Sequence, residues 1–374
     1  MPRYLLASHD GYGLGHARRS SLLASALLDA DPASRVTLVT GLPFSPSWLG
    51  ARAMEIVRVP PMLKHQDHGY QALGMSFEEA VARRAEVVLE CVDRHRPDVV
   101  VVDRHPYGIA GELRPGLEAA RSQGARVLLG LRDVLDDPAV VREETTGAGW
   151  NGVEDVYDEA LVYGARHFCD HATEYGLPLP VRYCGWVVDA PETGAPRRVE
   201  RLLSVAAGGG GDGREVFRLG IGVAERRPDW SVMVSAGPYA DTAALARLVA
   251  RSPARARIAM VTDVAGCTSL FARAGAVLEM AGYNSTFEAL AAGHRPILVP
   301  RQRPRVEQLI RAQRLAALGL ADVVDEDAAP STVTDLLDRP RRLAPEDLAR
   351  SGITLDGACR AASIIHARAT STRP

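Results

Sequence analysis

The sequence predicts an α/β protein built from two doubly wound, mostly parallel sheets, one in each of two domains. Along the 374 residues, apolar runs of strand length alternate with amphipathic helical segments, which is the pattern of βα units. The run Asp98–Asp103 (DVVVVD) is apolar without alternation, as expected of a parallel strand buried on both faces. The alternation is interrupted at Ala190–Arg198 (APETGAPRR), a polar segment with Pro and Gly that is typical of a linker.

These observations set the expected domain boundaries. Residues 1–190 should form an N-terminal Rossmann-like domain, 191–198 a linker, and 199–374 a C-terminal domain whose last helix is free to pack back on the first domain. The chain is also too long for one ordinary domain. Ligands of doubly wound sheets bind beyond the carboxyl ends of the strands, so the two domains are expected to face each other across a cleft.

The first half contains seven expected strands and three expected helices. The strands are Tyr4–Ser8, Arg35–Thr40, Ile56–Val59, Asp98–Asp103, Arg126–Leu131, Glu159–Tyr163 and Val181–Val188. One helix is expected to begin at about His16, and the other two are expected to span Phe77–Arg94 and Leu113–Ser122. Residues 60–75 carry Pro, His and Gly without periodicity and are expected to form a long functional loop. Residues 133–157 fit neither pattern.

The second half repeats the alternation. Its expected strands are Leu202–Ala206, Trp230–Ser235, Arg257–Val261, Ala276–Met280, Pro296–Pro300 and Ala321–Val324. Its expected helices are Arg214–Glu225, Thr242–Ala250, Cys267–Arg273, Ser285–Ala292, Val306–Leu318, Thr332–Leu337 and Leu355–Ala367.

Composition excludes several classes of partner. The net charge of −2 provides no basic footprint for nucleic acid or for an anionic membrane. The five Cys show no CxxC spacing, which argues against a zinc knuckle or a disulfide framework and favours a reducing cytoplasm. The apolar run near the N-terminus has only strand length, so neither a signal peptide nor stable membrane insertion is expected. Composition sets no oligomeric state.

A candidate anion site lies in the segment Leu278–Pro300. Asn284, Ser285 and Thr286 are placed to cap the start of the expected helix, whose N-terminal amides would point beyond the carboxyl end of a parallel strand. Glu288, expected on the first turn, could accept hydrogen bonds from the hydroxyls of a ribose. The alternative is an ordinary βαβ unit with a well-capped helix.

The turn Gly11–His16 (GYGLGH) is Gly-rich and opens a helix. It lacks the third glycine of the dinucleotide fingerprint, and Thr40-Gly41 occupies the place of the ribose-binding acid, so an NAD enzyme is disfavoured. His16 is a candidate general base, because imidazole can take a proton from a hydroxyl at neutral pH. A helix-capping or core histidine is the alternative.

Asp103 ends its strand at the same sheet edge as this turn. Its carboxylate could accept a hydrogen bond from Nδ1–H of His16, fix the tautomer and stabilise the imidazolium. Alternatively, Asp103 caps the next helix or pairs with Arg104. His105 is a rival base two residues further on.

Two further segments of the second half carry polar or flexible groups. The run Gly208–Gly211 follows a strand and would let a phosphate approach backbone amides, unless it is simply a flexible surface turn. Glu307 and Gln308 open a helix after Arg301–Val306 and could bind sugar hydroxyls, unless this charged run is a solvated face. The acidic runs offer no third ligand at metal-binding spacing, so no metal site is expected.

In this order and spacing, the motifs resemble those of GT-B glycosyltransferases. The likeness is greatest to the family of the lipid-linked peptidoglycan N-acetylglucosaminyltransferase and its predicted bacterial relatives. It rests on Gly13–His16, Gly208–Gly211, Ala281–Glu288 and Pro300–Gln308. The resemblance covers 202–324 well, and covers the N-terminal domain only through the first turn and the strand order.

The resemblance implies transfer of a sugar from a nucleoside diphosphate donor, with UDP expected, to an acceptor bound mainly by the N-terminal domain. His16 would be the base and Asp103 the residue that orients it. The implied donor-binding residues are Gly208, Gly209, Gly210, Met260, Val261, Gly282, Asn284, Ser285, Thr286, Glu288, Arg303, Glu307 and Gln308. The implied acceptor-binding residues are Gly13, Leu14, Gly15, Arg18 and His105. Glu307 stands where the peptidoglycan enzyme has glutamine, which leaves the donor sugar open.

The resulting expectation is an inverting, metal-independent transferase that needs no cofactor beyond the nucleotide sugar. Its acceptor would be a small, soluble molecule with a hydroxyl or amine. Two alternatives remain at this stage: a non-hydrolysing nucleotide-sugar 2-epimerase, and a non-catalytic partner subunit that binds nucleotide sugar.

Overall fold

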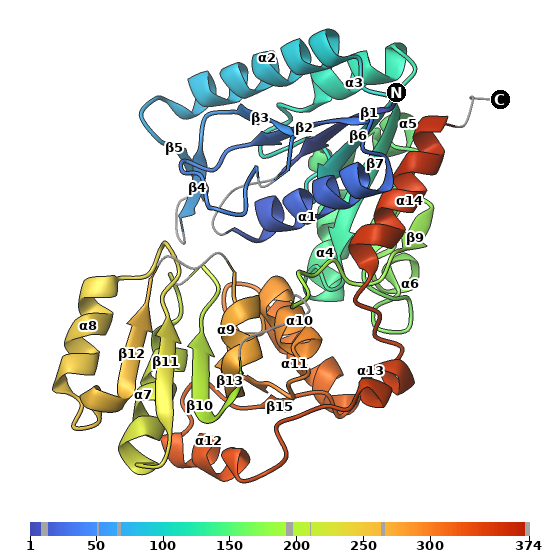
Figure 1. The fold of residues 1–374 in the computed structure, drawn as a ribbon. Helices are drawn as coiled ribbons and strands as arrows, with labels where there is room; N and C mark the ends of the chain where they lie inside the picture. Colours follow the sequence, from blue (N-terminus) through green and yellow to red (C-terminus); the bar gives the residue numbers. More distant parts are fainter. Residues whose placement is uncertain are drawn as a thin grey trace. The chain divides into compact units, whose positions relative to one another are not determined.

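The computed structural model describes residues 1–8, 14–50, 52–65, 69–191, 197–209, 211–262 and 266–370. The chain forms two compact units, Met1–Val187 with Asp356–Pro374, and Val188–Leu355 (Figure 1). The chain thus leaves the first unit close to the expected linker, of which residues 192–196 lie outside the described part. No helix in the described ranges is long and apolar enough to cross a membrane.

A parallel sheet forms the centre of the first unit. Its described strands lie in the order β3-β2-β1-β6-β7-β8-β9, and every strand pair is parallel. They are β1 (Arg3–Ala7), β2 (Arg35–Thr40), β3 (Glu55–Arg58), β6 (Val99–Asp103), β7 (Arg126–Arg132), β8 (Glu159–Tyr163) and β9 (Val181–Tyr183). The last strand is shorter than expected, because Gly185 at φ +79° turns the chain soon after Tyr183.

Helices cover both faces of this sheet (Figure 1). α2 (Phe77–His95) packs beside α3 (Arg114–Ser122), and α1 (Gly15–Ala30) packs beside α14 (Gly357–Thr370). The segment that the sequence left ambiguous contains short helices, namely α4 (Pro138–Thr146), η1 (Ala148–Trp150) and α5 (Val153–Val156), and α6 (His171–Tyr175) follows β8.

The expected loop 60–75 is instead largely a hairpin, so that prediction was wrong. β4 (Met62–His65) pairs in antiparallel fashion with β5 (Gly69–Ala72). Met62 and Ala72 are buried together with Ala80 of α2. The strands are too short to show periodicity in the sequence, and it is their packing against α2 that stabilises them.

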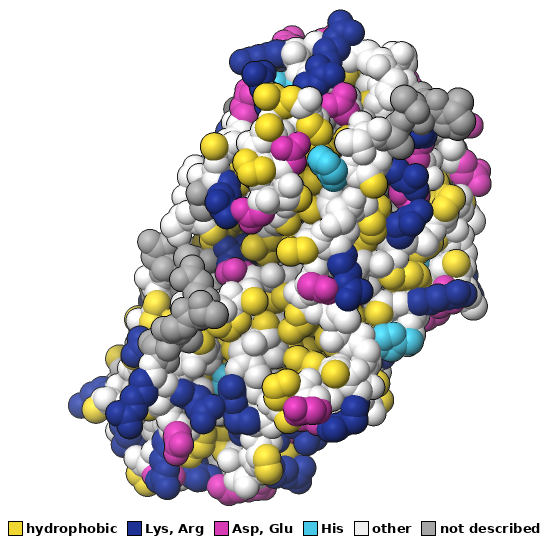
Figure 2. All heavy atoms as spheres, turned by 45° about the vertical axis from the view of Figure 1, so that its right-hand side comes forward, with side chains coloured by type: hydrophobic (Ala, Val, Ile, Leu, Met, Phe, Trp, Pro, Cys, Tyr) yellow, Lys and Arg dark blue, Asp and Glu magenta, His cyan; other side chains and the backbone are white. Residues whose placement is uncertain are grey.

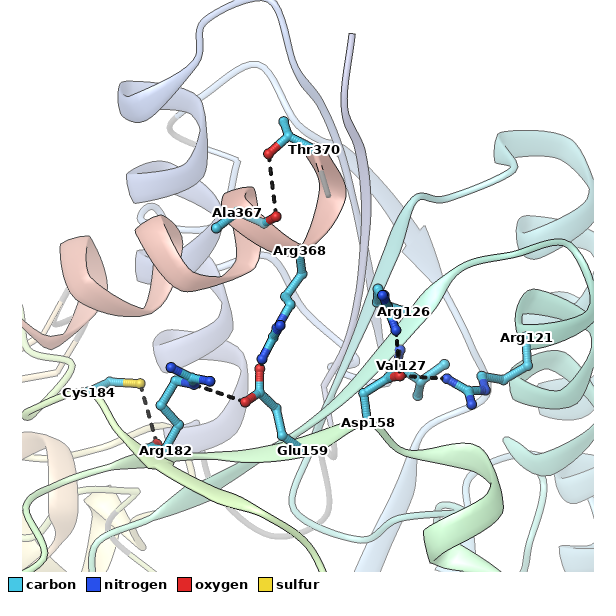
Figure 3. A network of polar contacts seen from close by, with 10 residues as sticks. All are labelled: Arg121, Arg126, Val127, Asp158, Glu159, Arg182, Cys184, Ala367, Arg368 and Thr370. Atoms are coloured by element: carbon cyan, nitrogen blue, oxygen red, sulfur yellow. Dashed lines mark hydrogen bonds and ion pairs between the residues drawn. The ribbon is translucent and has the colours of Figure 1, made fainter. Parts of the chain in front are cut away.

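α14 belongs to the first unit although it is last in the chain. Arg368 donates from Nε to Oε1 of Glu159 in β8 at 2.7 Å, and Arg182 donates to the other carboxylate oxygen at 2.9 Å (Figure 3). The hydroxyl of Tyr4 lies 2.8 Å from Nδ1 of His366. These contacts connect the C-terminal helix to β8 and β1, and Glu159 in turn binds Arg182 of β9.

The second unit repeats the architecture. Its described strands lie in the order β12-β11-β10-β13-β14-β15, again parallel throughout. They are β10 (Val199–Ala206), β11 (Ser231–Ser235), β12 (Ile258–Val261), β13 (Ala274–Glu279), β14 (Ile297–Leu298) and β15 (Asp322–Val323). β14 is shorter than expected, because prolines at 296 and 300 cannot donate to the ladder. The two parallel sheets confirm the predicted α/β class.

The helices of the second unit are α7 (Arg214–Arg226), α8 (Thr242–Arg251), η2 (Arg255–Arg257), α9 (Thr268–Arg273), α10 (Tyr283–Ala291), α11 (Glu307–Ala317), α12 (Pro330–Leu337) and α13 (Pro345–Ser351). Strands β10, β11 and β13 share one core with α7 and α12. A smaller core lies between β13, α9 and α10. On the face shown in Figure 2, basic and acidic side chains are interspersed, in keeping with the small net charge.

Candidate functional site

In the first unit, the structure brings His16 and Asp103 together. β1 lies between β2 and β6, and Ala7 pairs with Val102, so α1 begins beside the carboxyl end of β6. His16 is the second residue of α1, and Asp103 is the last residue of β6. Nδ1 of His16 lies 3.3 Å from Oδ1 of Asp103. The helix that follows β6 has Leu113 as its N-cap, so Asp103 does not cap it.

Arg19 is a third member of this cluster, and the sequence analysis missed it. Its Nη2 donates to both carboxylate oxygens of Asp103, at 2.8 and 2.7 Å, and lies 3.1 Å from Nδ1 of His16. Arg19 is 2% exposed, and its guanidinium lies 5.6 Å from the ring centre of Tyr163. Residues three apart lie on the same face of a helix, so the spacing from His16 to Arg19 is the feature of the sequence that could have indicated this contact.

The protonation states in this cluster suit proton abstraction. Burial raises the pKa of Asp103, but Arg19 and His16 outweigh it, and the pKa lies below its ordinary value. Burial lowers the pKa of His16, and Arg19 and Arg132 lower it further, while Asp103 opposes them. At neutral pH the carboxyl is therefore ionised and the imidazole is uncharged, which is the form that accepts a proton.

The expected acceptor-binding residues lie around the same helix start. Leu14 is the N-cap of α1, Gly15 is its first residue, and Gly13 lies outside the described residues. Arg18 is 7% exposed, with its guanidinium 5.2 Å from the ring centre of Trp48. The rival base His105 is partly exposed and accepts a hydrogen bond from Gly108 through its carbonyl oxygen.

In the second unit, the turn between β13 and α10 differs from the expected capping. Gly282 is the N-cap of α10, in extended backbone, and as a glycine it makes no side-chain capping hydrogen bond. The predicted caps Asn284, Ser285 and Thr286 lie within the first turn instead, because the helix begins at Tyr283. The capping prediction was wrong, but the N-terminus of α10 still follows the carboxyl end of a parallel strand, which is the arrangement that favours an anion.

Glu288 is also displaced from the expected position. It lies in the second turn of α10, is 3% exposed, and accepts a hydrogen bond from the backbone N–H of Cys267 at 2.9 Å. The carboxylate therefore links α10 to the start of α9. A ribose contact by Glu288 stays a prediction.

Two buried residues that the sequence analysis missed shape this turn. Arg311 of α11 is fully buried, and its Nη1 donates to the carbonyl oxygen of Ala281 at 2.8 Å. Glu279, the last residue of β13, is also fully buried. Burial raises its pKa well above the ordinary value, with Glu288 adding to the rise and Ser285 opposing it. The raised pKa favours the uncharged form of Glu279, which adds no negative charge beside the helix N-terminus.

The glycine run after β10 packs closely on the next βα connection. Gly208 adopts φ +55°, and a Cβ on Gly237 would collide with the carbonyl oxygens of Gly208 and Gly209. The N–H of Tyr239 donates to the carbonyl oxygen of Gly209 at 3.0 Å. These contacts hold the described part of the run against the β11–α8 connection, whereas Gly210 lies outside the described residues.

Arg301 joins the residues expected to contact the donor sugar. Its two terminal nitrogens bind Glu307 at 2.8 Å and Asp212 at 2.9 Å, and its backbone N–H donates to Gln308 at 3.0 Å. Glu307 and Gln308 are 4% and 9% exposed, so this helix start is no solvated face. Arg303 is exposed, and Met260 and Val261 are partly exposed on β12.

The described residues contain no group of three or more His, Cys, Asp or Glu side chains that could hold a metal ion. The candidate base and the candidate anion site belong to different units.

No protein-family model matches this sequence, and no curated protein matches it significantly. Solved structures of glycosyltransferases are similar over the whole chain. MurG of Acinetobacter baumannii is 16% identical with a TM-score of 0.60, over 98% of this chain and 99% of MurG. The calicheamicin glycosyltransferase CalG4 is 19% identical with a TM-score of 0.63, over 100% of both chains.

A third similar structure is Phytolacca americana UGT2, complexed with UDP-2-fluoro-glucose and pterostilbene. It is 12% identical with a TM-score of 0.63, over 99% of this chain and 100% of that one. At these identities the likeness establishes the fold. The chain has the GT-B fold, and the expected resemblance is confirmed at that level.

Proposed function

We propose that this protein is a glycosyltransferase that moves a sugar from a nucleoside diphosphate donor to a small acceptor, with inversion and without a metal ion. The observation that carries the proposal is the cluster at the start of α1. There an uncharged imidazole and an ionised carboxylate are 3.3 Å apart at the carboxyl edge of a doubly wound sheet. A fold shared with known glycosyltransferases supports it.

In this proposal the second unit binds the donor. The first turn of α10, with Gly282, Ser285 and Thr286, would hold the diphosphate, because the polarised helix terminus attracts negative charge. Glu288 would bind the ribose, and Glu307 and Gln308 the sugar. The run Gly208–Gly211 and strand β12 would contact the remainder of the nucleotide.

The first unit would bind the acceptor and supply the base. Nε2 of His16 takes the proton of an acceptor hydroxyl or amine while that atom bonds to the anomeric carbon. The bond from the anomeric carbon to the diphosphate oxygen breaks on the opposite side, so the configuration inverts. The electron pair leaves with the nucleoside diphosphate, whose charge the α10 terminus neutralises, so the mechanism calls for no metal.

The donor nucleotide, the type of acceptor and the cellular compartment can also be proposed. UDP is the proposed donor nucleotide, as in the UGT2 complex with UDP-2-fluoro-glucose. We place the acceptor among small soluble molecules, because the net charge of −2 provides no basic attraction to membrane lipid. We place the reaction in the cytoplasm, because the spacing of the five Cys favours a reducing compartment.

A two-stage experiment tests the proposal. Nucleotide sugars are first screened by thermal shift, since a ligand that binds the folded state raises the apparent stability. The donor that binds is then incubated with an acceptor library, and released nucleoside diphosphate is measured. We expect release that depends on acceptor. Isomerised sugar from donor alone would indicate an epimerase, and binding without release across the library would indicate a binding subunit; either result overturns the proposal.

A further inference from the structure

Arg19 makes contacts that a residue of purely structural importance would not need. A single nitrogen, Nη2, is within 2.8 Å of both carboxylate oxygens of Asp103 and 3.1 Å from Nδ1 of His16. The side chains of Arg19 and Asp103 are 3% and 4% exposed, and that of His16 is 21% exposed. The guanidinium therefore contacts both members of the proposed catalytic pair, which also contact each other directly.

Arg19 and Asp103 compete for the same atom, Nδ1 of His16. Arginine only donates hydrogen bonds, whereas a carboxylate only accepts them. Nδ1 of His16 can accept from Arg19 only if the ring proton is on Nε2, and it can donate to Asp103 only if the proton is on Nδ1. Only in the second tautomer is Nε2 unprotonated, which is the state that can take a proton from an acceptor.

We propose that Arg19 is a positioning residue for the base: it fixes the Asp103 carboxylate and competes with it for Nδ1 of His16, so that it sets the tautomer and the basicity of the imidazole. This inference rests on the proposed function for its catalytic meaning, and on the contacts alone for its effect on His16. Arg19 opposes the tautomer with the proton on Nδ1 and Asp103 favours it, so the balance of the two contacts sets how much of the base is in its reactive form.

The charged groups around His16 agree with this role. Arg19 comes from α1, Asp103 from the end of β6, and Arg132 from the end of β7; Tyr163 of β8 lies against Arg19. α14 packs along α1, but its His366 and Arg368 contact Tyr4 and Glu159. Among the described charged groups, Arg19 and Arg132 thus oppose protonation of His16, and Asp103 favours it. Burial lowers the pKa of His16 most, and Arg19 adds to that effect. Removing Arg19 takes away one of the groups that lower this pKa and leaves Asp103, which raises it, in place, so His16 should bind a proton more readily.

The test compares the wild-type protein with Arg19→Met, which keeps much of the side-chain volume, and Arg19→Lys, which keeps the charge. Nitrogen chemical shifts of His16, assigned by their absence in His16→Gln, report its tautomer and its titration without any substrate. In Arg19→Met we expect the titration to move to higher pH and the tautomer to change toward Nδ1–H. Arg19→Lys should stay close to the wild type.

A pH–rate comparison adds the catalytic readout. The rate is measured at about pH 6 and about pH 8, two values that bracket the ordinary pKa of histidine. The ratio of the first rate to the second should fall in Arg19→Met, because a His16 that binds a proton more readily is protonated to a greater extent at the lower pH. Because it is a ratio, a uniform loss of activity does not change it. Arg341→Met is the matched control, since it breaks a similarly buried pair with Asp322 in the other unit, with side chains 4% and 13% exposed. Its His16 titration should equal that of the wild type.

The outcomes separate this inference from the proposed function. An unchanged titration and tautomer of His16 in Arg19→Met would overturn the role of Arg19. The same is true if Arg341→Met shifts the titration equally. If the wild-type protein shows no sugar transfer at all, the proposed function fails. The resonances of His16 still decide, in that case, whether Arg19 controls the tautomer and the titration of His16.

Discussion

Arg311 and Ala281 are joined by a buried hydrogen bond: Nη1 of the arginine donates to the backbone carbonyl oxygen at 2.8 Å, and Arg311 is fully buried. Ala281 lies in the turn that leads into α10, the proposed diphosphate site. A residue 30 positions further along the chain thus fixes the backbone at this turn.

Replacing Arg311 with Met should therefore affect both stability and donor binding. We expect a loss of about 1.5–3 kcal/mol in the free energy of unfolding, the range for a hydrogen bond to a charged group. Urea unfolding measures it, and donor titration should show weaker binding. Arg251→Met, at an exposed site at the end of α8, serves as the control and should stay within about 0.5 kcal/mol of the wild type. Unchanged donor affinity in Arg311→Met would contradict the role of this turn.

His16→Ala should reduce turnover by about 100- to 10,000-fold, the usual contribution of a general base. Its donor affinity should match that of the wild type, because the proposed donor site lies in the other unit. Steady-state rates and donor titration measure the two effects separately. Asp103→Asn should also lower turnover, because it removes the carboxylate that lies 3.3 Å from the ring. A variant without His16 that turns over at nearly the wild-type rate would refute the base assignment.

His294 should make stability fall in mild acid. The ring is fully buried, with Nε2 2.7 Å from the carbonyl oxygen of Phe271. Burial lowers its pKa from 6.5 to about 4, with Arg342 and Arg198 adding to the effect and the Phe271 hydrogen bond opposing it. As the pH falls below about 6.5, the unfolded chain binds this proton and the folded protein does not, so the folded state loses stability until about pH 4. The total is about 3 kcal/mol.

The measurement is the free energy of urea unfolding across this pH range, for the wild type minus His294→Gln. The difference should decline toward acid and level off below about pH 4. His167→Gln, at an exposed position, is the matched control and should show no comparable trend. A flat difference for His294→Gln would contradict the buried, uncharged state.

Glu279→Gln should stabilise the protein at neutral pH. The pKa of Glu279 is raised in the folded state, chiefly by burial. As the pH rises past the ordinary value of 4.5, the unfolded chain releases this proton first, so the wild-type protein loses stability with rising pH. Glutamine has the same shape and no proton to lose. Urea unfolding should show a stability advantage for Glu279→Gln that disappears in acid. An advantage that is independent of pH would show that folding does not raise the pKa of Glu279.

Much of the fold could be predicted from the sequence. The strand Asp98–Asp103 and the helix Phe77–Arg94 correspond closely to β6 and α2, because continuous apolar runs and helical periodicity are local properties. The hairpin of β4 and β5 was missed, since it is stabilised by burial against α2. The start of α10 was misplaced, since hydroxyl residues suit both a cap and a first turn.

The sequence by itself determined the alternation of strands and helices, and it marked His16, Asp103 and the start of α10 as places for chemistry. Only the tertiary structure decided which charges meet. Arg19 and Asp103 are 84 positions apart, and Arg301 binds an aspartate 89 positions away. Periodicity reports whether a residue is buried, whereas the ionic partner of a buried residue depends on the register and order of strands, which no local pattern contains.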